Sequence, residues 1–124
     1  MAPGELVHER LTHSAIGAFY TVYNTLEHGY LEQTYVGALA VELRERGHVV
    51  EREVSVRVWY KGHVVGWHRL DLLVDQTLVV EVKSTPTLHP SAQRQLLNYL
   101  AATRLEVGLL LHFGAKPRFY RVVG

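Results

Sequence analysis

The feature that most constrains the fold is a strand-like stretch from residue 49 to residue 83 that is broken only by short turns. Apolar side chains alternate with polar ones over 49–60, at Val50, Val54, Val56, Val58 and Tyr60, and a period of two is typical of a half-buried strand. Lys61-Gly62 and Asp75-Gln76 have the composition of tight hairpin turns. The sequence therefore predicts three consecutive antiparallel strands, at 49–60, 63–74 and 77–83.

Helical periodicity precedes and follows these strands. Apolar residues recur at steps of three or four from Gly4 to Leu26, and again up to Gly47, which suits a left-handed helix cap. A third helix is predicted at 91–103, before two short strands at 107–113 and 117–123. The resulting order, ααβββαββ, predicts an α/β or α+β fold with a mixed sheet flanked by helices.

Length and composition predict one domain spanning residues 1–124. A chain of 124 residues with 48% hydrophobic and 20% charged residues can bury a core and has the composition of a globular protein. The chain has no cysteine, which excludes disulfides, thiolate metal sites and a cysteine nucleophile. No apolar run approaches the ~20 residues that cross a bilayer, and the amino terminus lacks a signal-peptide core. We therefore expect a cytoplasmic protein without a membrane partner.

Charged residues lie within the apolar strands. Glu81 and Lys83 share one face of their strand, while the valines beside them face the other way. Asp71 is embedded in the preceding strand, and the turn at 75–76 brings the two strands together. Because buried charges are costly unless they are paired or bound to a metal, these residues predict either an internal salt bridge or a site.

The acidic residues are candidate metal ligands. Asp71 and Glu81 carry the hard oxygen donors that Mg²⁺ or Mn²⁺ prefers, and the main-chain carbonyl of Val82 could supply another. Lys83 beside such a metal could orient or activate an attacking water. Glu32 is a third candidate carboxylate, in the first turn of the second helix, where a simple favourable charge at the helix end explains it equally well.

Further side chains could contact a substrate. Gln95 and Tyr99 are four residues apart and therefore adjacent on one helical face. Over the strand end, Gln95 could hold a water at the metal or a phosphate, and Tyr99 could contact a sugar or a phosphate oxygen. Arg69 precedes Asp71 by two positions, and alternation predicts that both share a face. Arg69 is thus a candidate phosphate contact, with a salt bridge to a neighbouring acid equally open.

Several motifs occur in order along nearly the whole chain: Gly29-x-x-Glu32-x-x-Tyr35, Asp71, Glu81-Val-Lys83 and Gln95-x-x-x-Tyr99. Together they resemble the GxxExxY family of the PD-(D/E)XK nuclease superfamily. The combined pattern is far more specific than the short E-x-K element, which recurs by chance in many strands. Leu70 stands where a proline often precedes the aspartate.

The resemblance implies a mixed sheet flanked by helices and assigns roles to the charged residues. Asp71 and Glu81 would be metal ligands, Lys83 the catalytic lysine, and Glu32 the acidic residue borne by a helix. Gln95 and Tyr99 are similar to the QxxxY element of RecB-type and lambda-exonuclease-type members, where the pair supports the active site.

The function that this resemblance implies is a nuclease that uses Mg²⁺ or Mn²⁺ to hydrolyse phosphodiester bonds, leaving 5′-phosphate and 3′-hydroxyl ends. DNA is the favoured partner, and a homodimer would enlarge the grip on it. One alternative is a non-catalytic nucleic-acid-binding or scaffold domain, and another is a regulatory or toxin-like nuclease acting on RNA. Neither a G-x-S-x-G setting nor a phosphate-cradling glycine loop occurs, so serine hydrolases and nucleotide triphosphatases are unsupported.

Overall fold

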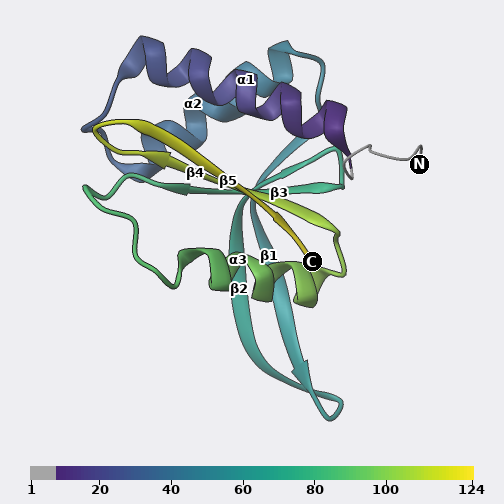
Figure 1. Ribbon diagram of the computed structural model, residues 1–124. Helices are drawn as coiled ribbons and strands as arrows, with labels where there is room; N and C mark the ends of the chain where they lie inside the picture. Colours follow the sequence, from purple (N-terminus) through teal and green to yellow (C-terminus); the bar gives the residue numbers. More distant parts are fainter. Residues whose placement is uncertain (1–7) are drawn as a thin grey trace.

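A five-stranded sheet lies at the centre of the structure, a computed structural model that describes residues 8–124 (Figure 1). The elements are α1 (Glu9–Leu26), α2 (Glu32–Glu45), β1 (Val50–Tyr60), β2 (His63–Val74), β3 (Leu78–Lys83), α3 (Ala92–Thr103), β4 (Val107–Phe113) and β5 (Pro117–Val123). The predicted order ααβββαββ and the α+β class, a mixed sheet flanked by helices, are confirmed. The predicted residues 4–7 of the first helix lie outside the described part of the chain.

The strands follow one another across the sheet in the order β1-β2-β3-β4-β5. All neighbours are antiparallel except β3 and β4, which are parallel. A parallel pair requires a crossover connection, and α3 provides it. The predicted meander of β1, β2 and β3 is therefore confirmed, and β3 lies in the middle of the sheet.

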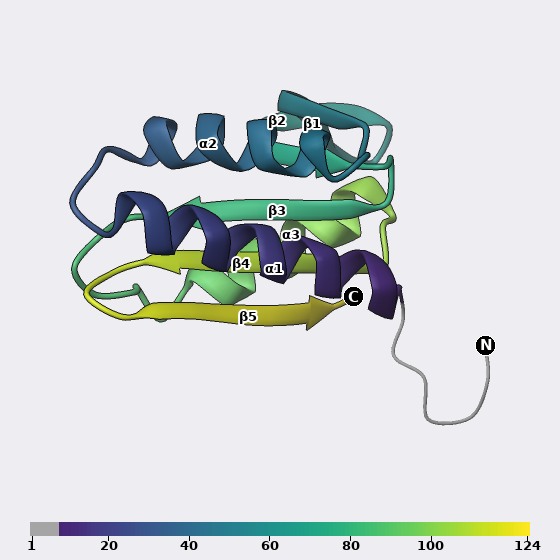
Figure 2. The ribbon, with the colours of Figure 1, turned by 90° about the horizontal axis from the view of Figure 1, so that it is seen from above.

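Helices cover both faces of the sheet. Figure 2 shows α1 and α2 across one face, with α3 behind the sheet. Leu72, Val80 and Leu109 belong to the core under α1 and α2, whereas Leu73 and Leu110 belong to the core under α3. Because β3 is covered on both faces, its sequence reads as a nearly continuous apolar run, and Glu81 is a buried exception within it.

The turns have the backbone that their composition predicts. Lys61 and Gly62 have φ of 48° and 79°, and Asp75 and Gln76 have φ of 52° and 56°. Positive φ at both central residues is typical of the tight type I′ hairpin turn, which matches the twist of the strands. The left-handed end of α2 is also confirmed, since Gly47 has a φ of 90°.

The β1–β2 hairpin changes the face that it turns toward the helices. Val50 and Leu72 pack with α1 and α2, whereas Val56 and Leu70 pack with α3. The change falls at Glu53, which has a φ of 53° and is skipped in the pairing with β2. The prediction that Val50 shares a face with the later valines of β1 is therefore wrong, because a left-handed residue interrupts the alternation.

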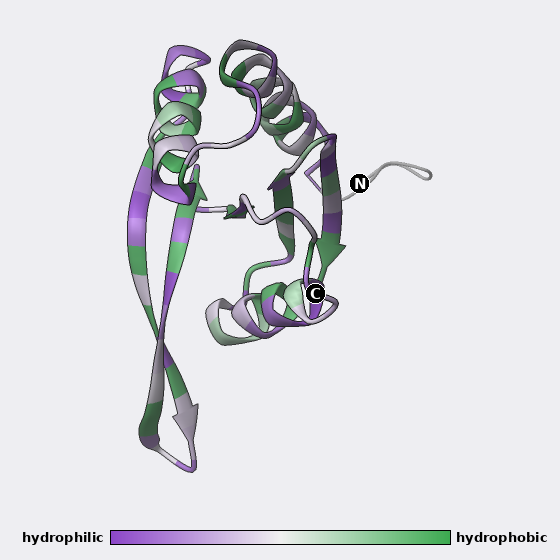
Figure 3. Ribbon diagram, turned by 90° about the vertical axis from the view of Figure 1, so that its left-hand side faces the viewer, coloured by the Kyte–Doolittle hydropathy of each residue, from purple (hydrophilic) through white to green (hydrophobic). Residues whose placement is uncertain are grey.

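Part of this hairpin extends beyond the sheet. Only Leu72–Val74 of β2 pair with β3, and the rest of the hairpin projects past the layer of α3 (Figure 3). We call residues 55–69 the arm. No helix among residues 8–124 combines the length and the apolar character needed to span a membrane.

Candidate active site

Asp71 and Glu81 lie where β2 and β3 separate. The pairing of these strands ends at Leu72 and Val80, and side chains replace the ladder hydrogen bonds beyond that point. The backbone N–H of Asp71 donates to Oε1 of Glu81 at 3.2 Å, and the N–H of Val82 donates to Oδ2 of Asp71 at 2.8 Å. The two carboxylates predicted to converge are therefore together, each bonded to the other's strand.

Burial dominates the electrostatics of this pair. Glu81 is 5% exposed, and burial, followed by the negative charge of Asp71, raises the pKa of Glu81 to about 9. Lys83 acts in the opposite direction, because its positive charge favours the ionised carboxylate. In the absence of a cation, Glu81 therefore retains its proton at neutral pH.

Lys83 and Glu32 complete the charged cluster. Val80 and Val82 pack under α1 and α2, so alternation turns Glu81 and Lys83 toward the α3 side. Glu32 is the first residue of α2, and its pKa is raised by burial and by Asp71 while Lys83 lowers it. These mutual effects place Glu32 in electrostatic range of Asp71 and Lys83.

Tyr35 fixes the loop that leads to Glu32. The Tyr35 hydroxyl donates to the carbonyl of Glu27 at 2.5 Å and accepts the N–H of Tyr30 at 3.1 Å. The ring stacks on Phe113, with 4.0 Å between the ring centroids. The sequence placed Tyr35 in the Gly29-x-x-Glu32-x-x-Tyr35 motif and assigned no role to its hydroxyl. Its hydroxyl is a positioning group, which a tyrosine rather than a phenylalanine at this apolar position could have indicated.

Tyr99 borders the acidic pair, whereas Gln95 is exposed. Burial and then the charges of Glu81 and Asp71 raise the pKa of Tyr99, which places its phenol near both carboxylates. Gln95 lies one turn earlier on α3, and within residues 8–124 its side chain makes no hydrogen bond. The structure thus brings Tyr99 to the site and leaves the Gln95 amide free for a ligand.

Arg69 is not on the face that alternation predicts. The ring of His68 lies 4.8 Å from that of Tyr99 between centroids, and Leu70 packs in the core under α3. Arg69 lies between them in sequence, so its exposed side chain points away from α3. The prediction that Arg69 and Asp71 share a face of β2 is wrong, because the hairpin changes the face that it turns toward the helices between Leu70 and Leu72. Arg69 forms no salt bridge within residues 8–124.

Two histidines near the site have packing contacts that the sequence did not reveal. His112 is the partner of Lys83 in the parallel β3–β4 register, and its Nε2 lies 2.6 Å from the carbonyl oxygen of Thr85. It anchors the loop after β3. The contact of His68 with Tyr99 depends on the twist of the arm, and no local sequence pattern predicts it.

The donor chemistry of the pair fits a hard divalent cation. Asp71 and Glu81 supply carboxylate oxygens within a buried strand environment, and Mg²⁺ is commonly bound through one or two carboxylates while it keeps several waters. Within residues 8–124, no group of three or more His, Asp or Glu side chains is gathered as a metal cluster. Glu32 is therefore a nearby carboxylate, outside the close Asp71–Glu81 pair.

The structure is thus an α+β protein in which two carboxylates meet where the central strands of a mixed sheet separate. The family model described as the PD-(D/E)XK nuclease superfamily matches residues 9–122. The chain therefore belongs to this superfamily, whose nucleases generally use divalent metal ions and act on nucleic acid.

A solved structure also resembles this chain. The structure titled "Crystal structure of SSO0001" is 21% identical with a TM-score of 0.55, and the match covers 71% of this chain and 46% of that chain. At this identity the likeness supports the fold alone, and the chain spans less than half the length of that protein. A comparison with curated proteins found no match.

Proposed function

We propose that this chain is a metal-dependent nuclease of the GxxExxY family that hydrolyses phosphodiester bonds of DNA to 5′-phosphate and 3′-hydroxyl ends. The observation that carries the proposal is the Asp71–Glu81 pair, in which each carboxylate is hydrogen-bonded to the other's strand. Lys83 and Glu32 interact electrostatically with this pair. A buried carboxylate such as Glu81 beside a second acid is costly without a ligand, which favours a functional site over a structural salt bridge.

The carboxylates would hold the cation. Asp71 and Glu81 are the principal ligands in this proposal, joined by the carbonyl of Val82, and Glu32 acts from the start of α2. Bound Mg²⁺ or Mn²⁺ would stabilise the negative charge that develops on the phosphoryl and leaving oxygens during in-line attack by water. Binding requires Glu81 to release the proton that burial retains.

The remaining residues act on the substrate. The ammonium of Lys83, whose charge acts on both Glu32 and Glu81, would orient the attacking water or a phosphoryl oxygen. Tyr99 borders both carboxylates and contacts the sugar or a phosphate, and the free amide of Gln95 holds a water or a phosphate beside it. Arg69 contacts the phosphate backbone from the outer side of the arm.

Cleavage of end-labelled nucleic acids tests the proposal. Purified protein is incubated with single-stranded, double-stranded and flapped DNA and with RNA, in Mg²⁺, Mn²⁺ or EDTA. We expect cleavage of DNA that requires the metal, is lost in Asp71→Asn and is unchanged in Glu45→Gln, an exposed carboxylate at the far end of α2. Cleavage of RNA alone would support the RNA-directed alternative. Binding without cleavage of any substrate would support the non-catalytic alternative.

A further inference from the structure

The arm has the charge of a surface that binds an anion. From Val54 to Leu70 the chain contains no aspartate or glutamate, while Arg57, Lys61 and Arg69 are basic. The protein as a whole has a formal net charge of only +1. The arm therefore carries three positively charged side chains and no negatively charged one, and such a local excess attracts a polyanion.

The arm also exposes large aromatic side chains. Trp59 and Trp67, the only tryptophans in the chain, are 58% and 61% exposed, and Tyr60 at the tip is 62% exposed. Arg57 lies over Trp67, with its Cζ 5.3 Å from the ring centroid. Exposed aromatic rings beside cations are typical of surfaces on which unpaired bases stack.

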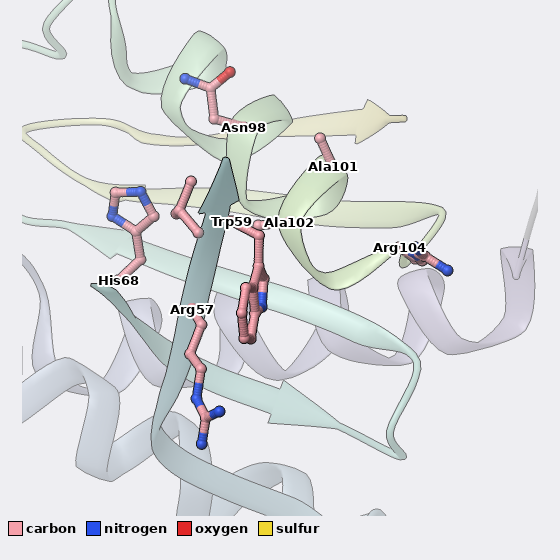
Figure 4. A pocket seen from close by; sticks show the side chains of 8 residues that line it. Arg57, Trp59, His68, Asn98, Ala101, Ala102 and Arg104 are labelled. Carbon is pink, nitrogen blue, oxygen red and sulfur yellow. The ribbon is translucent and has the colours of Figure 1, made fainter. Parts of the chain in front are cut away.

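A cavity of about 480 Å³ lies between the arm and α3 (Figure 4). Arg57, Trp59 and His68 line it from the arm, and Asn98 and Arg104 line it from α3 and its C-cap. We call this cavity the arm groove. No acidic residue lines it, and its volume lies within the range of small-ligand sites, roughly 300–1,000 Å³.

The arm groove lies beside the acidic pair rather than over it. His68 lines the groove, and its ring is 4.8 Å from the ring of Tyr99 between centroids. Tyr99 in turn is close enough to Asp71 and Glu81 for their charges to affect it. A strand that crosses the acidic pair can therefore continue past Tyr99 and His68 into the groove.

We propose that the arm groove binds unpaired nucleotides of the DNA substrate next to the cleavage site, with one base stacked on Trp59 and the flanking phosphates held by Arg57 and Arg104. This inference rests on the proposed nuclease function, and it assigns a single-stranded region of DNA as the ligand. Asn98 carries an amide that can hydrogen-bond to a base edge, and the small side chains of Ala101 and Ala102 leave room for the base.

The chemistry of the groove favours a single strand over a duplex or a second copy of this chain. Bases in a duplex are stacked on one another, so their faces are unavailable to Trp59, whereas unpaired bases stack readily on aromatic side chains. A second copy would bring the same uncompensated positive charge to the contact, because the arm has no acidic residue between Val54 and Leu70. A phosphate backbone neutralises that charge.

Binding of a fluorescein-labelled thymidine oligonucleotide, measured by anisotropy in EDTA, tests this proposal without cleavage. Trp59→Ala is expected to weaken binding about tenfold or more, since stacking contributes that much per base, while Trp59→Phe retains most of the affinity. Phe119→Ala is the control, because Phe119 is an exposed aromatic side chain on β5, beside Tyr20 of α1, and does not line the groove. Its effect is expected to stay below about threefold.

The role of Arg57 as a charge and the direct contact of Trp59 with a base are measured by separate experiments. Arg57→Gln is expected to reduce the slope of log affinity against log salt by about 0.7, the value for one contact to a single strand. Arg10→Gln removes an exposed arginine from α1, on the opposite face of the sheet, and should leave the slope unchanged. In a Trp67→Phe background, Trp59 is the sole tryptophan, and its emission should be quenched when the oligonucleotide binds.

Several results would overturn the proposal. An unchanged affinity of Trp59→Ala for the thymidine oligonucleotide would do so. So would a variant that loses affinity only for duplex DNA, or only for a uridine oligonucleotide, and keeps its affinity for the thymidine oligonucleotide. If sedimentation shows that Trp59→Ala converts a dimer to a monomer without changing oligonucleotide affinity, the arm is a contact between subunits. Binding is measured without a metal, so the two proposals can fail separately. If the protein binds the oligonucleotide through Trp59 but cleaves nothing, the result supports nucleotide binding in the arm groove and contradicts only the proposed nuclease activity.

Discussion

At the scale of single residues, Glu81 shows the main conflict between stability and function. The Glu81 carboxyl group is costly to ionise because it is buried in the central strand and lies beside a second acid, Asp71. The sequence was sufficient to single out Asp71, Glu81 and Lys83, because charges in apolar strands are conspicuous. Glu32 was found through the Gly29-x-x-Glu32-x-x-Tyr35 motif at the start of a helix. The sequence could not indicate that Asp71 and Glu81 bond to each other's strands, since that depends on where β2 and β3 separate.

Glu81 predicts a specific pH dependence of stability in metal-free protein. Its pKa is about 9 in the folded state against 4.5 for the ordinary group, so the folded state binds more protons between these values. The contribution of Glu81 to stability is then greatest below about pH 4.5 and falls as the pH rises toward 9. Glu81→Gln removes this ionisation and should be the more stable protein at pH 7, by an amount on the order of a few kcal/mol.

Urea unfolding in EDTA at several pH values measures this effect. The difference between Glu81→Gln and wild type should grow with pH over the range below the folded-state pKa. Parallel curves, with a constant difference, would show that Glu81 ionises freely in the folded protein.

Tyr35 predicts an effect on activity through the position of Glu32. Tyr35→Phe keeps the ring stacked on Phe113 and removes the hydroxyl that bonds to Glu27 and Tyr30. The loss of two partly buried hydrogen bonds should cost about 1–3 kcal/mol, and DNA cleavage should decrease because the loop before α2 is less constrained. Thermal unfolding and cleavage rates, measured below the lowered unfolding temperature, separate the two effects. An unchanged rate would limit Tyr35 to stability.

At the scale of elements, the sequence predicted the bounds of most helices and strands closely. The strands at 63–74, 107–113 and 117–123 are confirmed as predicted, because Gly, Pro and Asp residues at their ends have strong turn preferences. It was harder to predict which side of the sheet each side chain of the β1–β2 hairpin faces. A glutamate has no local preference for the left-handed conformation that Glu53 adopts, so the change of face and the resulting position of Arg69 could not be predicted.

A chain of hydrogen bonds connects three elements at the end of the sheet. Nε2 of His48 lies 2.7 Å from Oγ of Ser14 on α1, and Nδ1 of His48 lies 2.7 Å from Oδ2 of Asp75 in the β2–β3 turn. The order resembles a hydrolase triad. Ser14, however, lies within a helix whose N–H groups are already hydrogen-bonded, which leaves no oxyanion hole beside it. We interpret the chain as a structural tether.

The tether predicts an acid-sensitive contribution to stability. Burial opposes the ionisation of Asp75, but hydrogen bonds from His48 and from the Val49 N–H outweigh it and lower its pKa. Its contribution is therefore present above the ordinary value of 3.8 and is lost as the pH falls through the lower folded-state value. Asp75→Asn should destabilise by about 1 kcal/mol at pH 7, because the side chain is 36% exposed and partly screened.

Thermal unfolding of Asp75→Asn and wild type at pH 7 and at pH 3 measures this contribution. The difference should narrow at the lower pH. Asparagine tolerates the left-handed backbone of this position, so the change tests the charge rather than the turn. An equal difference at both pH values would assign the effect to packing instead.

At the scale of the whole molecule, the sheet separates two regions. Each side carries an apolar core, and the α3 side also carries Glu81, Lys83 and the arm groove. The mixed sheet and its order were predictable from the periodicities of the sequence. The projection of the arm was not, because strand length alone does not indicate how few residues of β2 pair with β3.

The central claim is that the charged residues between β2 and β3 form a metal-dependent catalytic site. Its most direct test is the single-turnover rate of DNA cleavage by wild type and Lys83→Ala in Mn²⁺, with the unfolding temperature measured in the same buffers. The account predicts that Mn²⁺ raises the unfolding temperature of both proteins, while the variant cleaves at least about 100-fold more slowly. Cleavage by Lys83→Ala at the wild-type rate would contradict the account.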